Sequence, residues 1–280
     1  MTEELLSWYD KKNYNMPWRI DKNPYRIWIS EIMLQQTQVK TVIPYYEKWM
    51  IRYPTTQILA ESDIDDVLKS WEGLGYYKRA HNIKKSAEYI CNNLKGKFPK
   101  NDALKELPGI GDYTYSAIMS IAYNERIPAI DGNVKRVFSR IFEQNFINAS
   151  DIRNLSKTII EYMPEKRPGC FNQAIMDLGR EICKPKNPKC SSCPVNSECK
   201  ALINDSISKY PKKVIRKKIP VWEVVVAIIF NDNNRLLITK RPIDKMLGGL
   251  WELPGGKKEK KETIQDCIIR EIKEELNVEI

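Results

Sequence analysis

The first two hundred residues carry apolar side chains at the spacing of helices. Apolar positions recur three and four residues apart in four segments, 28–50, 113–123, 134–142 and 152–163, which places them on one face of an α-helix. The stretches between these segments are short and contain Pro, Gly or an Asn-Asp pair, which end helices and make turns. We therefore expect a mainly α-helical domain over residues 1–204.

The pattern changes after this domain. Residues 205–220 contain six Lys or Arg and two Pro with little periodicity, which predicts a basic linker. Residues 221–241 hold a β-branched run, an Asn/Asp turn and a second apolar run, and they predict a hairpin. Residues 262–276 have the spacing of a helix. Residues 221–280 are thus expected to form a partial α+β module.

Charge and apolar content narrow the class of partner. The net charge of this 280-residue chain is 46 − 36 = +10, which favours nucleic acid or an anionic membrane surface. The longest apolar run, residues 224–230, is far shorter than the roughly 20 residues that span a bilayer. The first residues also lack the pattern of a secretory signal. We expect a cytoplasmic monomer without a membrane partner, associated with the nucleoid in a bacterial cell.

Four cysteines fall within seventeen residues, separated by six, two and five residues. They are Cys183, Cys190, Cys193 and Cys199. In a cytosolic protein such a cluster more often holds metal than disulfides. Zinc is one candidate, but zinc ribbons usually pair two CxxC knuckles across a longer gap, whereas one close pair in a compact loop suits an iron–sulfur cubane. Four unrelated buried thiols are the alternative.

Residues 101–123 contain two helical segments joined by the turn LPGIG. Gly109 and Gly111 allow positive φ angles and let a phosphate approach without a Cβ in the way. The turn amides and the start of the second helix then offer N–H donors to that phosphate. This pattern predicts a helix-hairpin-helix that binds DNA without reading its bases. An ordinary helical hairpin with a glycine C-cap is the alternative.

Two carboxylates are candidates for acid–base chemistry. Apolar residues surround Glu31 along its segment, so burial is expected to raise its pKa and to suit it as a general acid. Asp131 directly precedes a predicted helix, where capping would keep it ionised and fixed. A protonated Glu opposite an ionised Asp is an arrangement that breaks glycosidic bonds. A structural Glu paired with an Arg and a purely capping Asp are the alternatives.

Five motifs follow one another along the chain: SEIMLQQTQV, WEGLGYYKRA, LPGIGDYTYSA, DGNVKRV and the cysteine loop. Their order resembles that of the MutY-type adenine DNA glycosylases, and the resemblance covers nearly all of residues 1–200. It implies the helix-hairpin-helix DNA glycosylase fold of the endonuclease III-like superfamily and a [4Fe-4S] cluster on the four cysteines. The partner that it implies is double-stranded DNA containing an adenine mispair.

The resemblance also implies roles for individual residues. Glu31 would protonate the adenine at N7, and Asp131 would stabilise the sugar carbon left behind before water completes the hydrolysis. A base inside a duplex must first be flipped out, and Gln36 and Tyr76 match the positions that fill the vacated space. A polar helix residue and a core aromatic are the alternatives for these two.

Tyr113 distinguishes two related classes of enzyme. In endonuclease III-type enzymes the matching position holds a lysine, which forms a Schiff base and cleaves the strand. A tyrosine cannot form a Schiff base. We therefore expect a monofunctional glycosylase that leaves an intact abasic site, with Tyr113 orienting Asp131.

The last part of the chain resembles Nudix hydrolases. Residues 256–278 match the Nudix signature except that Asn277 replaces its last Gly. Glu271, Glu274 and Glu275 are expected on one helix face, where they would hold Mg²⁺; an acidic solvated face is the alternative. The sequence stops two residues after the signature, so we expect unpaired strand edges in this region.

The function expected from these features is base excision repair by hydrolysis of the N-glycosidic bond of adenine mispaired with 8-oxoguanine or guanine, without strand cleavage. Three alternatives stay open. They are a thymine or other mismatch glycosylase of the same fold, a Nudix nucleotide pyrophosphohydrolase with a DNA-binding domain, and a DNA-binding protein without catalysis. The strength of the 8-oxoguanine preference is also open.

Overall fold

A computed structural model of the chain describes residues 1–12, 16–212, 220–242, 245 and 247–280. The chain divides into two compact units, Met1–Lys213 and Val214–Ile280. Of the predicted linker 205–220, residues 213–219 lie outside the described residues. Its described beginning packs on the first unit, where Arg140 Nε donates to the Tyr210 carbonyl oxygen at 3.0 Å.

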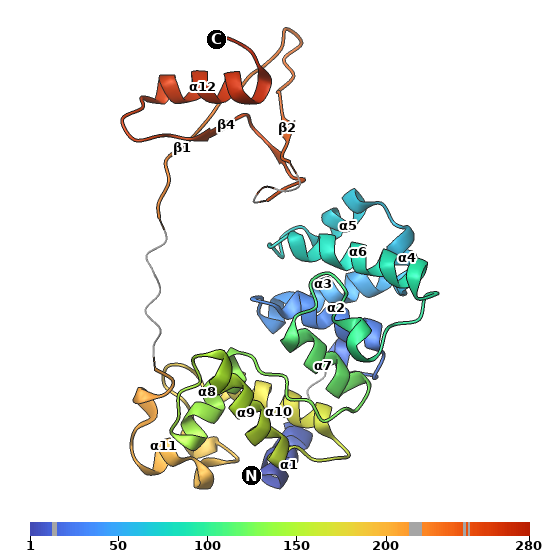
Figure 1. The fold of residues 1–280 in the computed structure, drawn as a ribbon, viewed down its shortest axis with the longest axis vertical. Helices are drawn as coiled ribbons and strands as arrows, with labels where there is room; N and C mark the ends of the chain where they lie inside the picture. The colour runs from blue at the N-terminus through green and yellow to red at the C-terminus, as the bar shows by residue number, and fades with distance from the viewer. Residues whose placement is uncertain (13–15, 213–219, 243–244, 246) are drawn as a thin grey trace. The chain divides into compact units, whose positions relative to one another are not determined.

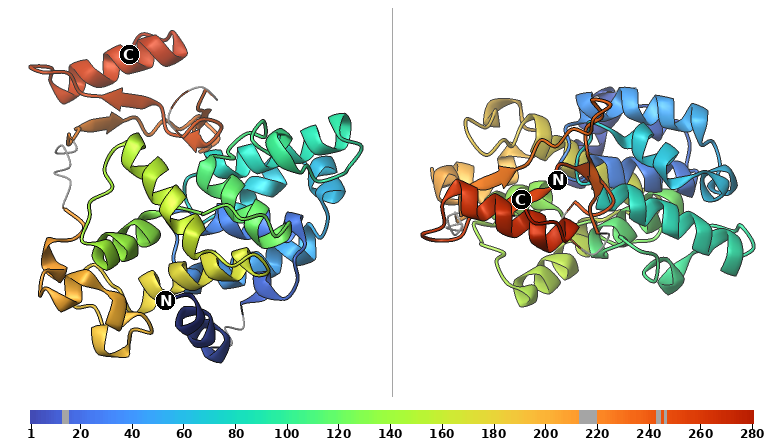
Figure 2. Two further views of the ribbon diagram at one scale, coloured as in Figure 1. Left: turned by 60° about the horizontal axis from the view of Figure 1, so that its bottom comes forward. Right: turned by 90° about the horizontal axis from the view of Figure 1, so that it is seen from above.

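The first unit is helical and consists of two lobes, each with its own apolar core (Figure 1, Figure 2). The first lobe contains α2 (Pro24–Leu34), α3 (Val39–Arg52), α4 (Thr56–Glu61), α5 (Ile64–Trp71), α6 (Lys78–Asn93) and α7 (Asp112–Ala122), with the 3₁₀ helices η1 (Pro17–Arg19) and η2 (Asn101–Leu104). The second lobe contains α1 (Thr2–Lys12), α8 (Gly132–Phe142), α9 (Ala149–Tyr162), α10 (Pro168–Glu181) and α11 (Lys200–Ile203), with η3 (Cys190–Ser192), η4 (Asn196–Glu198) and η5 (Ile207–Lys209). No helix among the described residues is long and apolar enough to cross a membrane.

Side-chain caps fix the start of the two helices that carry the predicted carboxylates. Asn23 Oδ1 accepts hydrogen bonds from the amides of Tyr25 and Arg26 at 3.0 and 3.3 Å, and Pro24 occupies the first turn of α2. Asp131 caps α8 in the same way, because its Oδ1 accepts from the Val134 amide at 2.7 Å. Local sequence therefore sets where α2 and α8 begin, and with them the places of both carboxylates on these helices.

The segment 28–50 is not one continuous helix, although its apolar spacing predicts one. α2 ends at Leu34, α3 begins at Val39, and Gln36 between them has a left-handed φ of 57°. The four residues 35–38 are all polar, Gln-Gln-Thr-Gln, so this stretch brings no apolar side chain to the core that would hold it in a helix.

The hairpin before α7 differs from the prediction in two respects. Gly109 has the expected positive φ of 84°, whereas Gly111 is the N-cap of α7 with an extended φ of −94°. The element before the turn is the four-residue 3₁₀ helix η2 rather than an α-helix. Gly111 nevertheless leaves an open surface, since a Cβ added there would meet no atom within 4 Å.

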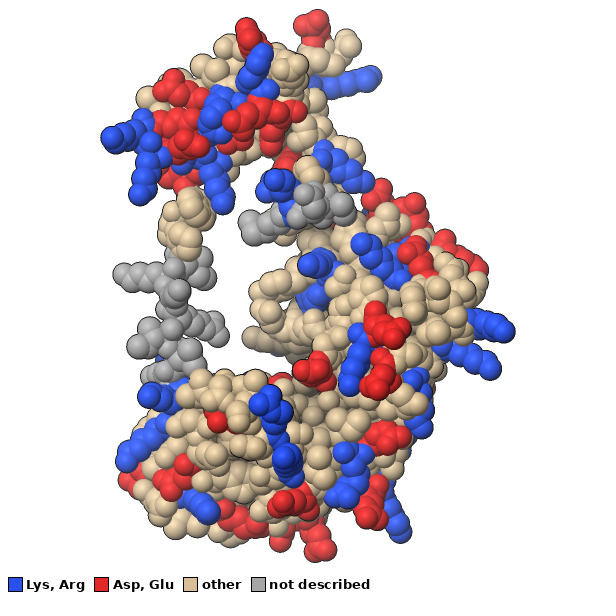
Figure 3. Space-filling view, viewed as in Figure 1, with Lys and Arg blue, Asp and Glu red and all other residues tan. Residues whose placement is uncertain are grey.

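The second unit contains two small antiparallel sheets and one helix. β1 (Val224–Val226) pairs with β4 (Gly255–Lys257), and β2 (Thr239–Lys240) pairs with β3 (Trp251–Glu252). α12 (Ile264–Leu276) contacts β1 and β4 and confirms the helix predicted at 262–276. Acidic and basic side chains intermix on the face of this unit that Figure 3 shows.

The hairpin predicted at 221–241 is correct only at its turn, where Phe230 and Leu236 form an antiparallel bridge. Its first run pairs with β4 instead of continuing against its second run. Gly255 allows this pairing, because a Cβ at that position would lie 2.2 Å from the Val225 carbonyl oxygen. The sequence pattern of the two runs contains no sign of this distant partner.

Candidate active site

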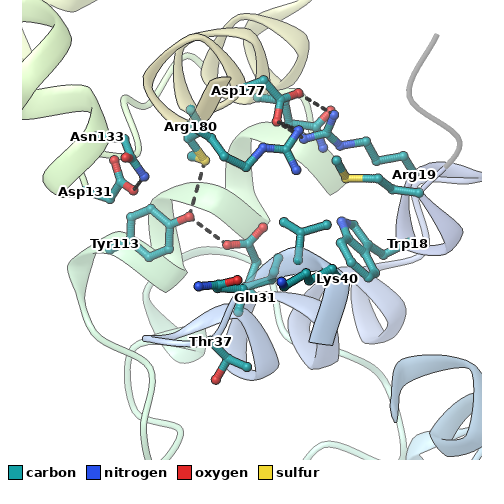
Figure 4. Close-up of a pocket in the computed structure, with 16 residues that line it drawn as sticks. Trp18, Arg19, Glu31, Thr37, Lys40, Tyr113, Asp131, Asn133, Asp177 and Arg180 are labelled. Atoms are coloured by element: carbon teal, nitrogen blue, oxygen red, sulfur yellow. Dashed lines mark hydrogen bonds and ion pairs between the residues drawn. The ribbon is translucent and has the colours of Figure 1, made fainter. Parts of the chain in front are cut away.

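A cavity of about 440 Å³ brings the two predicted carboxylates together (Figure 4). Both lobes of the first unit contribute to its wall. Residues that line it include Glu31 of α2, Tyr113 of α7, Asp131 at the start of α8, and Asp177 and Arg180 of α10. Apolar side chains such as Trp18 and Leu34 line the cavity together with these polar groups, a mixture that is typical of a ligand pocket.

Glu31 is a buried carboxyl group, with 6% of its surface exposed. Burial raises the pKa of Glu31 to about 7, although a hydrogen bond from Tyr113 and the charge of Arg19 both lower it. Among the described residues, the ion pair of Arg19 is with Asp177, while its charge still acts on Glu31. At neutral pH a substantial share of Glu31 therefore carries a proton.

Tyr113 contacts Glu31 rather than the residue that the sequence predicts. Its Oη donates a hydrogen bond of 2.8 Å to Glu31 Oε2 and lies 3.3 Å from Met176 Sδ. Burial raises the pKa of the Tyr113 hydroxyl well above its usual value, so the group stays protonated and remains a donor. The sequence predicts that Tyr113 orients Asp131; the hydroxyl bonds the Glu31 carboxyl instead, and an orienting effect on Asp131 stays a prediction.

Asp131 is held by donors on both of its oxygens. Oδ1 accepts from the Val134 amide at 2.7 Å, and Oδ2 accepts from Asn133 Nδ2 at 2.8 Å. The carboxylate also lies at the positive end of the α8 dipole, which favours a negative charge. Asp131 thus caps α8 and also lines the cavity. A purely capping role does not account for its place in the cavity wall.

An ion-pair group that the sequence does not predict lines the same cavity. Arg19 donates to Asp177 through Nη1 at 2.6 Å and Nη2 at 3.2 Å, and Arg180 Nη2 lies 3.0 Å from Asp177 Oδ1. Although burial opposes the charge, the Asp177 carboxylate raises the pKa of Arg19 above its usual value. Arg19 belongs to the MPWR segment, but no local pattern links it to a carboxylate 158 residues away.

Gln36 and Tyr76 lie close together outside this cavity. Tyr76 Oη donates to Gln36 Oε1 at 2.8 Å, and both side chains are exposed. With 58% of its surface exposed, Tyr76 is not a core aromatic, and Gln36 lies in a turn rather than a helix. A polar helix residue at position 36 and a core aromatic at position 76 are therefore both excluded.

The four cysteines lie in the loop that joins α10 to α11. Burial raises the pKa of Cys193 to about 11, and Cys183, Cys199 and Cys190 add to this rise, which shows that the four sulfurs are neighbours. Within the described part of the chain, no three His, Cys, Asp or Glu side chains converge closely enough to hold a single metal ion. The choice between an iron–sulfur cluster and zinc therefore stays a prediction from the sequence spacing of the four cysteines.

Two arginines of α8 attach the cysteine loop to the helix. Arg140 Nη1 lies 3.3 Å from Cys183 Sγ and donates to the Lys184 carbonyl oxygen at 2.8 Å. Arg136 Nε donates to the Cys183 carbonyl oxygen at 2.7 Å. Outer contacts of this kind orient the ligands of a metal site. The donor set is therefore compatible with an iron–sulfur cluster.

The acidic residues of the Nudix-like region are engaged within their own unit. Glu275 Oε2 accepts from the Gly255 amide at 3.1 Å, and Arg270 pairs with Glu262, Glu271 and Glu274 at 2.9, 2.8 and 3.6 Å. The predicted magnesium-binding role of Glu271, Glu274 and Glu275 stays a prediction.

Two family models and two solved structures indicate the class of protein to which this chain is similar. Residues 29–167 match the HhH-GPD superfamily base excision DNA repair proteins, and residues 221–280 match the NUDIX domain family. The structure of a thermostable thymine-DNA glycosylase superposes with a TM-score of 0.66 at 26% identity, covering 72% of this chain and 95% of that chain. A trapped endonuclease III–DNA covalent intermediate, at 21% identity, has the same fold, with a TM-score of 0.61 over 73% of this chain and 98% of that chain. Fold and site together define a helix-hairpin-helix DNA glycosylase of base excision repair.

Relatives of known function define the family. The adenine DNA glycosylase of Buchnera aphidicola subsp. Baizongia pistaciae is 42% identical over 85% of this chain and 69% of its own length. The human adenine DNA glycosylase is 34% identical over 93% of this chain and 58% of its own length. The chain belongs to the adenine DNA glycosylase family, which confirms both the predicted fold class and the predicted resemblance.

Proposed function

We propose that this chain removes adenine that is paired with 8-oxoguanine or guanine in double-stranded DNA, and that it leaves the strand uncut. The observation that carries the proposal is the pair of carboxylates in one cavity, Glu31 with a pKa of about 7 and Asp131 with donors on both oxygens. A proton donor opposite a fixed carboxylate is the arrangement that cleaves glycosidic bonds through an oxocarbenium-like state.

Glu31 acts as the general acid. Its Oε2 accepts the hydrogen bond from Tyr113, so Oε1 is the oxygen that carries the proton to N7 of the adenine. Protonation turns the base into a neutral leaving group and weakens the bond between N9 and the sugar carbon. Asp131 then stabilises the positive charge on the sugar, water adds to the same carbon, and an abasic site remains.

The strand stays intact because strand cleavage in this fold requires a Schiff base. Position 113, where the strand-cleaving endonuclease III-type enzymes hold their lysine, holds a tyrosine whose hydroxyl bonds Glu31. Hydrolysis by water is the remaining course for the sugar cation.

Gln36 and Tyr76 fill the space that the extruded adenine leaves in the duplex. Both are exposed and hydrogen-bonded to each other, so they enter the stack as one unit. A planar phenol ring can stack on either neighbouring base pair, and the amide can bond to the base that stays behind.

The backbone around Gly109 and Gly111 and the cysteine loop bind DNA phosphates. The open surface at Gly111 lets a phosphate approach the first amides of α7. A [4Fe-4S] cluster held by Cys183, Cys190, Cys193 and Cys199 would fix the loop that bears the exposed residues Lys184, Lys186, Lys189 and Lys200. These contacts position the duplex without reading its sequence.

A glycosylase assay on duplexes with A, T or U opposite guanine and 8-oxoguanine tests the proposal. We expect release of adenine alone, and none from the Glu31→Gln variant, which should still bind the duplex. Release of thymine would favour the activity named for the thymine-DNA glycosylase of similar structure. An unchanged duplex after incubation with folded, cluster-bearing protein would refute catalysis.

A further inference from the structure

Arg79 of α6 is a buried cation whose guanidinium is surrounded by backbone carbonyl groups. Only 8% of this residue is exposed. Its Nη1 donates to the carbonyl oxygens of Ile32, Met33 and Gln35 at 2.8, 3.1 and 2.7 Å, and its Nη2 donates to those of Leu74 and Gly75 at 3.0 and 3.1 Å. One side chain thus binds the end of α2 and the turn before α6, two segments about forty residues apart in sequence.

The carbonyl oxygens at the end of a helix favour a positive charge. Among the described residues, no ion pair involves Arg79, and burial lowers the pKa of its guanidinium. An apolar side chain in this place would leave five carbonyl oxygens without this donor, so Arg79 caps α2 and at the same time ties it to the turn before α6. The guanidinium also lies 5.2 Å from the Trp71 ring centroid and 5.5 Å from that of Tyr76, which fixes its plane.

Each bound segment leads directly into one of the two exposed side chains. The carbonyl of Gln35 precedes Gln36, and the carbonyl of Gly75 precedes Tyr76. Gln36 and Tyr76 both have left-handed backbone angles, with φ of 57° and 50°, a conformation that is unfavourable for residues with a Cβ. Surrounding structure has to impose it, and the Arg79 hydrogen bonds act on the peptide groups immediately before both residues.

We propose that Arg79 is a positioning residue for base extrusion, which holds the Gln36 turn and the Tyr76 turn in register so that the two side chains form one wedge. The inference rests on the base-extrusion step of the proposed function, because a wedge serves only an enzyme that opens a duplex. Arg79 itself touches neither the base nor the cavity. It acts through the backbone of the residues that enter the DNA.

Arg79→Lys is the test variant, because lysine keeps the charge but cannot present the planar fork to two segments at once. The matched control is Lys84→Met, also on α6, which removes a buried cation that donates to the Ala60 carbonyl oxygen at 2.7 Å away from the wedge. Melting temperature is measured for both variants. Base extrusion is followed by the fluorescence rise of 2-aminopurine opposite 8-oxoguanine, which needs no adenine hydrolysis.

We expect Arg79→Lys to slow the fluorescence rise and the single-turnover release of adenine by the same factor, at least tenfold, with little change in duplex affinity. Lys84→Met should leave the extrusion rate unchanged at a comparable loss of melting temperature. The effect of Arg79→Lys should also be less than additive with that of Tyr76→Phe, which removes the hydroxyl bonded to Gln36.

Three outcomes would overturn the inference. They are wild-type extrusion by Arg79→Lys, equal slowing by both variants at equal destabilisation, and full additivity with Tyr76→Phe. If the parent chain extrudes 2-aminopurine but releases no adenine from any duplex, the proposed function fails while the positioning role stands. If the parent chain produces no fluorescence rise, the positioning role fails.

Discussion

Tyr113 Oη donates a hydrogen bond of 2.8 Å to Oε2 of Glu31. Burial raises the pKa of Glu31 to about 7, while this bond acts in the opposite direction and lowers it. Burial alone would keep the carboxyl protonated well above neutral pH, where it would be a weak acid toward adenine. The tyrosine therefore sets the strength of the acid as well as its orientation.

Replacing Tyr113 by Phe should raise the pKa of Glu31, because the lost hydrogen bond stabilises the ionised form. The protonated form is the active one, so the rate of excision falls as pH rises through this pKa. In Tyr113→Phe the fall should occur at a pH about one unit or more higher. Single-turnover rates between pH 5 and 9 measure the shift.

Tyr115→Phe is the control for this profile, since Tyr115 lies on the same helix and its ring contacts Lys105 rather than Glu31. The excision rate of Tyr115→Phe should fall with rising pH at the same pH as that of the parent chain. A downward shift in Tyr113→Phe would mean that the hydroxyl does not stabilise the Glu31 carboxylate.

The stability of the protein should depend on pH through Glu31. Its pKa is about 7 when folded and about 4.3 when unfolded, so burial favours the neutral form. The stability linked to this group is fully present below about pH 4.3 and is lost as pH rises through about 7. Glu31→Gln does not show this loss. The free energy of unfolding of the variant relative to the parent chain should therefore be higher at pH 8.5 than at pH 5, by up to about 3 kcal/mol. Denaturant melts of both proteins at the two pH values test this, and an equal difference at both would refute the raised pKa.

Asp131→Asn should separate capping from catalysis. Asn is as good an N-cap as Asp, so the bond to the Val134 amide should be retained. The bond from Asn133 Nδ2 is lost, so a small fall in melting temperature is expected. The negative charge facing the sugar is lost, and we expect excision to slow by about 100-fold or more. Asp131→Ala provides the comparison, because it loses both properties and should destabilise the fold by about 1 kcal/mol. Near-normal excision by Asp131→Asn would show that the residue only caps α8.

Borohydride should trap little or no covalent complex between this chain and its abasic product. Trapping needs an amine at the sugar carbon, and the residue at position 113 is a tyrosine. Lys40 lines the cavity and is the amine to examine if a complex forms on a denaturing gel. An endonuclease III-type enzyme in parallel serves as the positive control. High-yield trapping that disappears in Lys40→Met would make the chain a strand-cleaving enzyme.

The sequence predicts those parts of the site that depend on neighbours in the chain. Glu31 is surrounded by apolar residues of its own helix, and Asp131 stands directly before a helix, so burial of the first and capping by the second follow from local pattern. The expectation that Tyr113 orients Asp131 rests on the family resemblance alone. The direction of its hydroxyl depends on how α2 packs against α7, which no spacing within either segment reveals.

Contacts between distant segments explain the other differences. Arg19 and Asp177 come from η1 and α10, and Arg79 binds carbonyl groups that every sequence possesses. A carbonyl oxygen has no residue-specific signal, so the register of the Gln36 and Tyr76 turns appears only in the folded chain. The break at residues 35–38 was hidden by apolar spacing that continues in phase on both sides.

Replacing Cys199, the most buried of the four clustered cysteines, by Ser should remove the iron–sulfur cluster. A [4Fe-4S] cluster is ligated by four thiolates, so we expect the parent chain to hold four irons with visible absorbance that bleaches on reduction. Without the cluster the loop would lose its anchor opposite Arg140, and duplex affinity should fall most strongly at low salt, where the loop lysines contribute most. Cys91→Ser, a half-buried thiol outside the loop, should change neither iron content nor affinity. A colourless parent chain with one bound zinc would refute the cluster, because the same four thiolates would then hold a single tetrahedral ion.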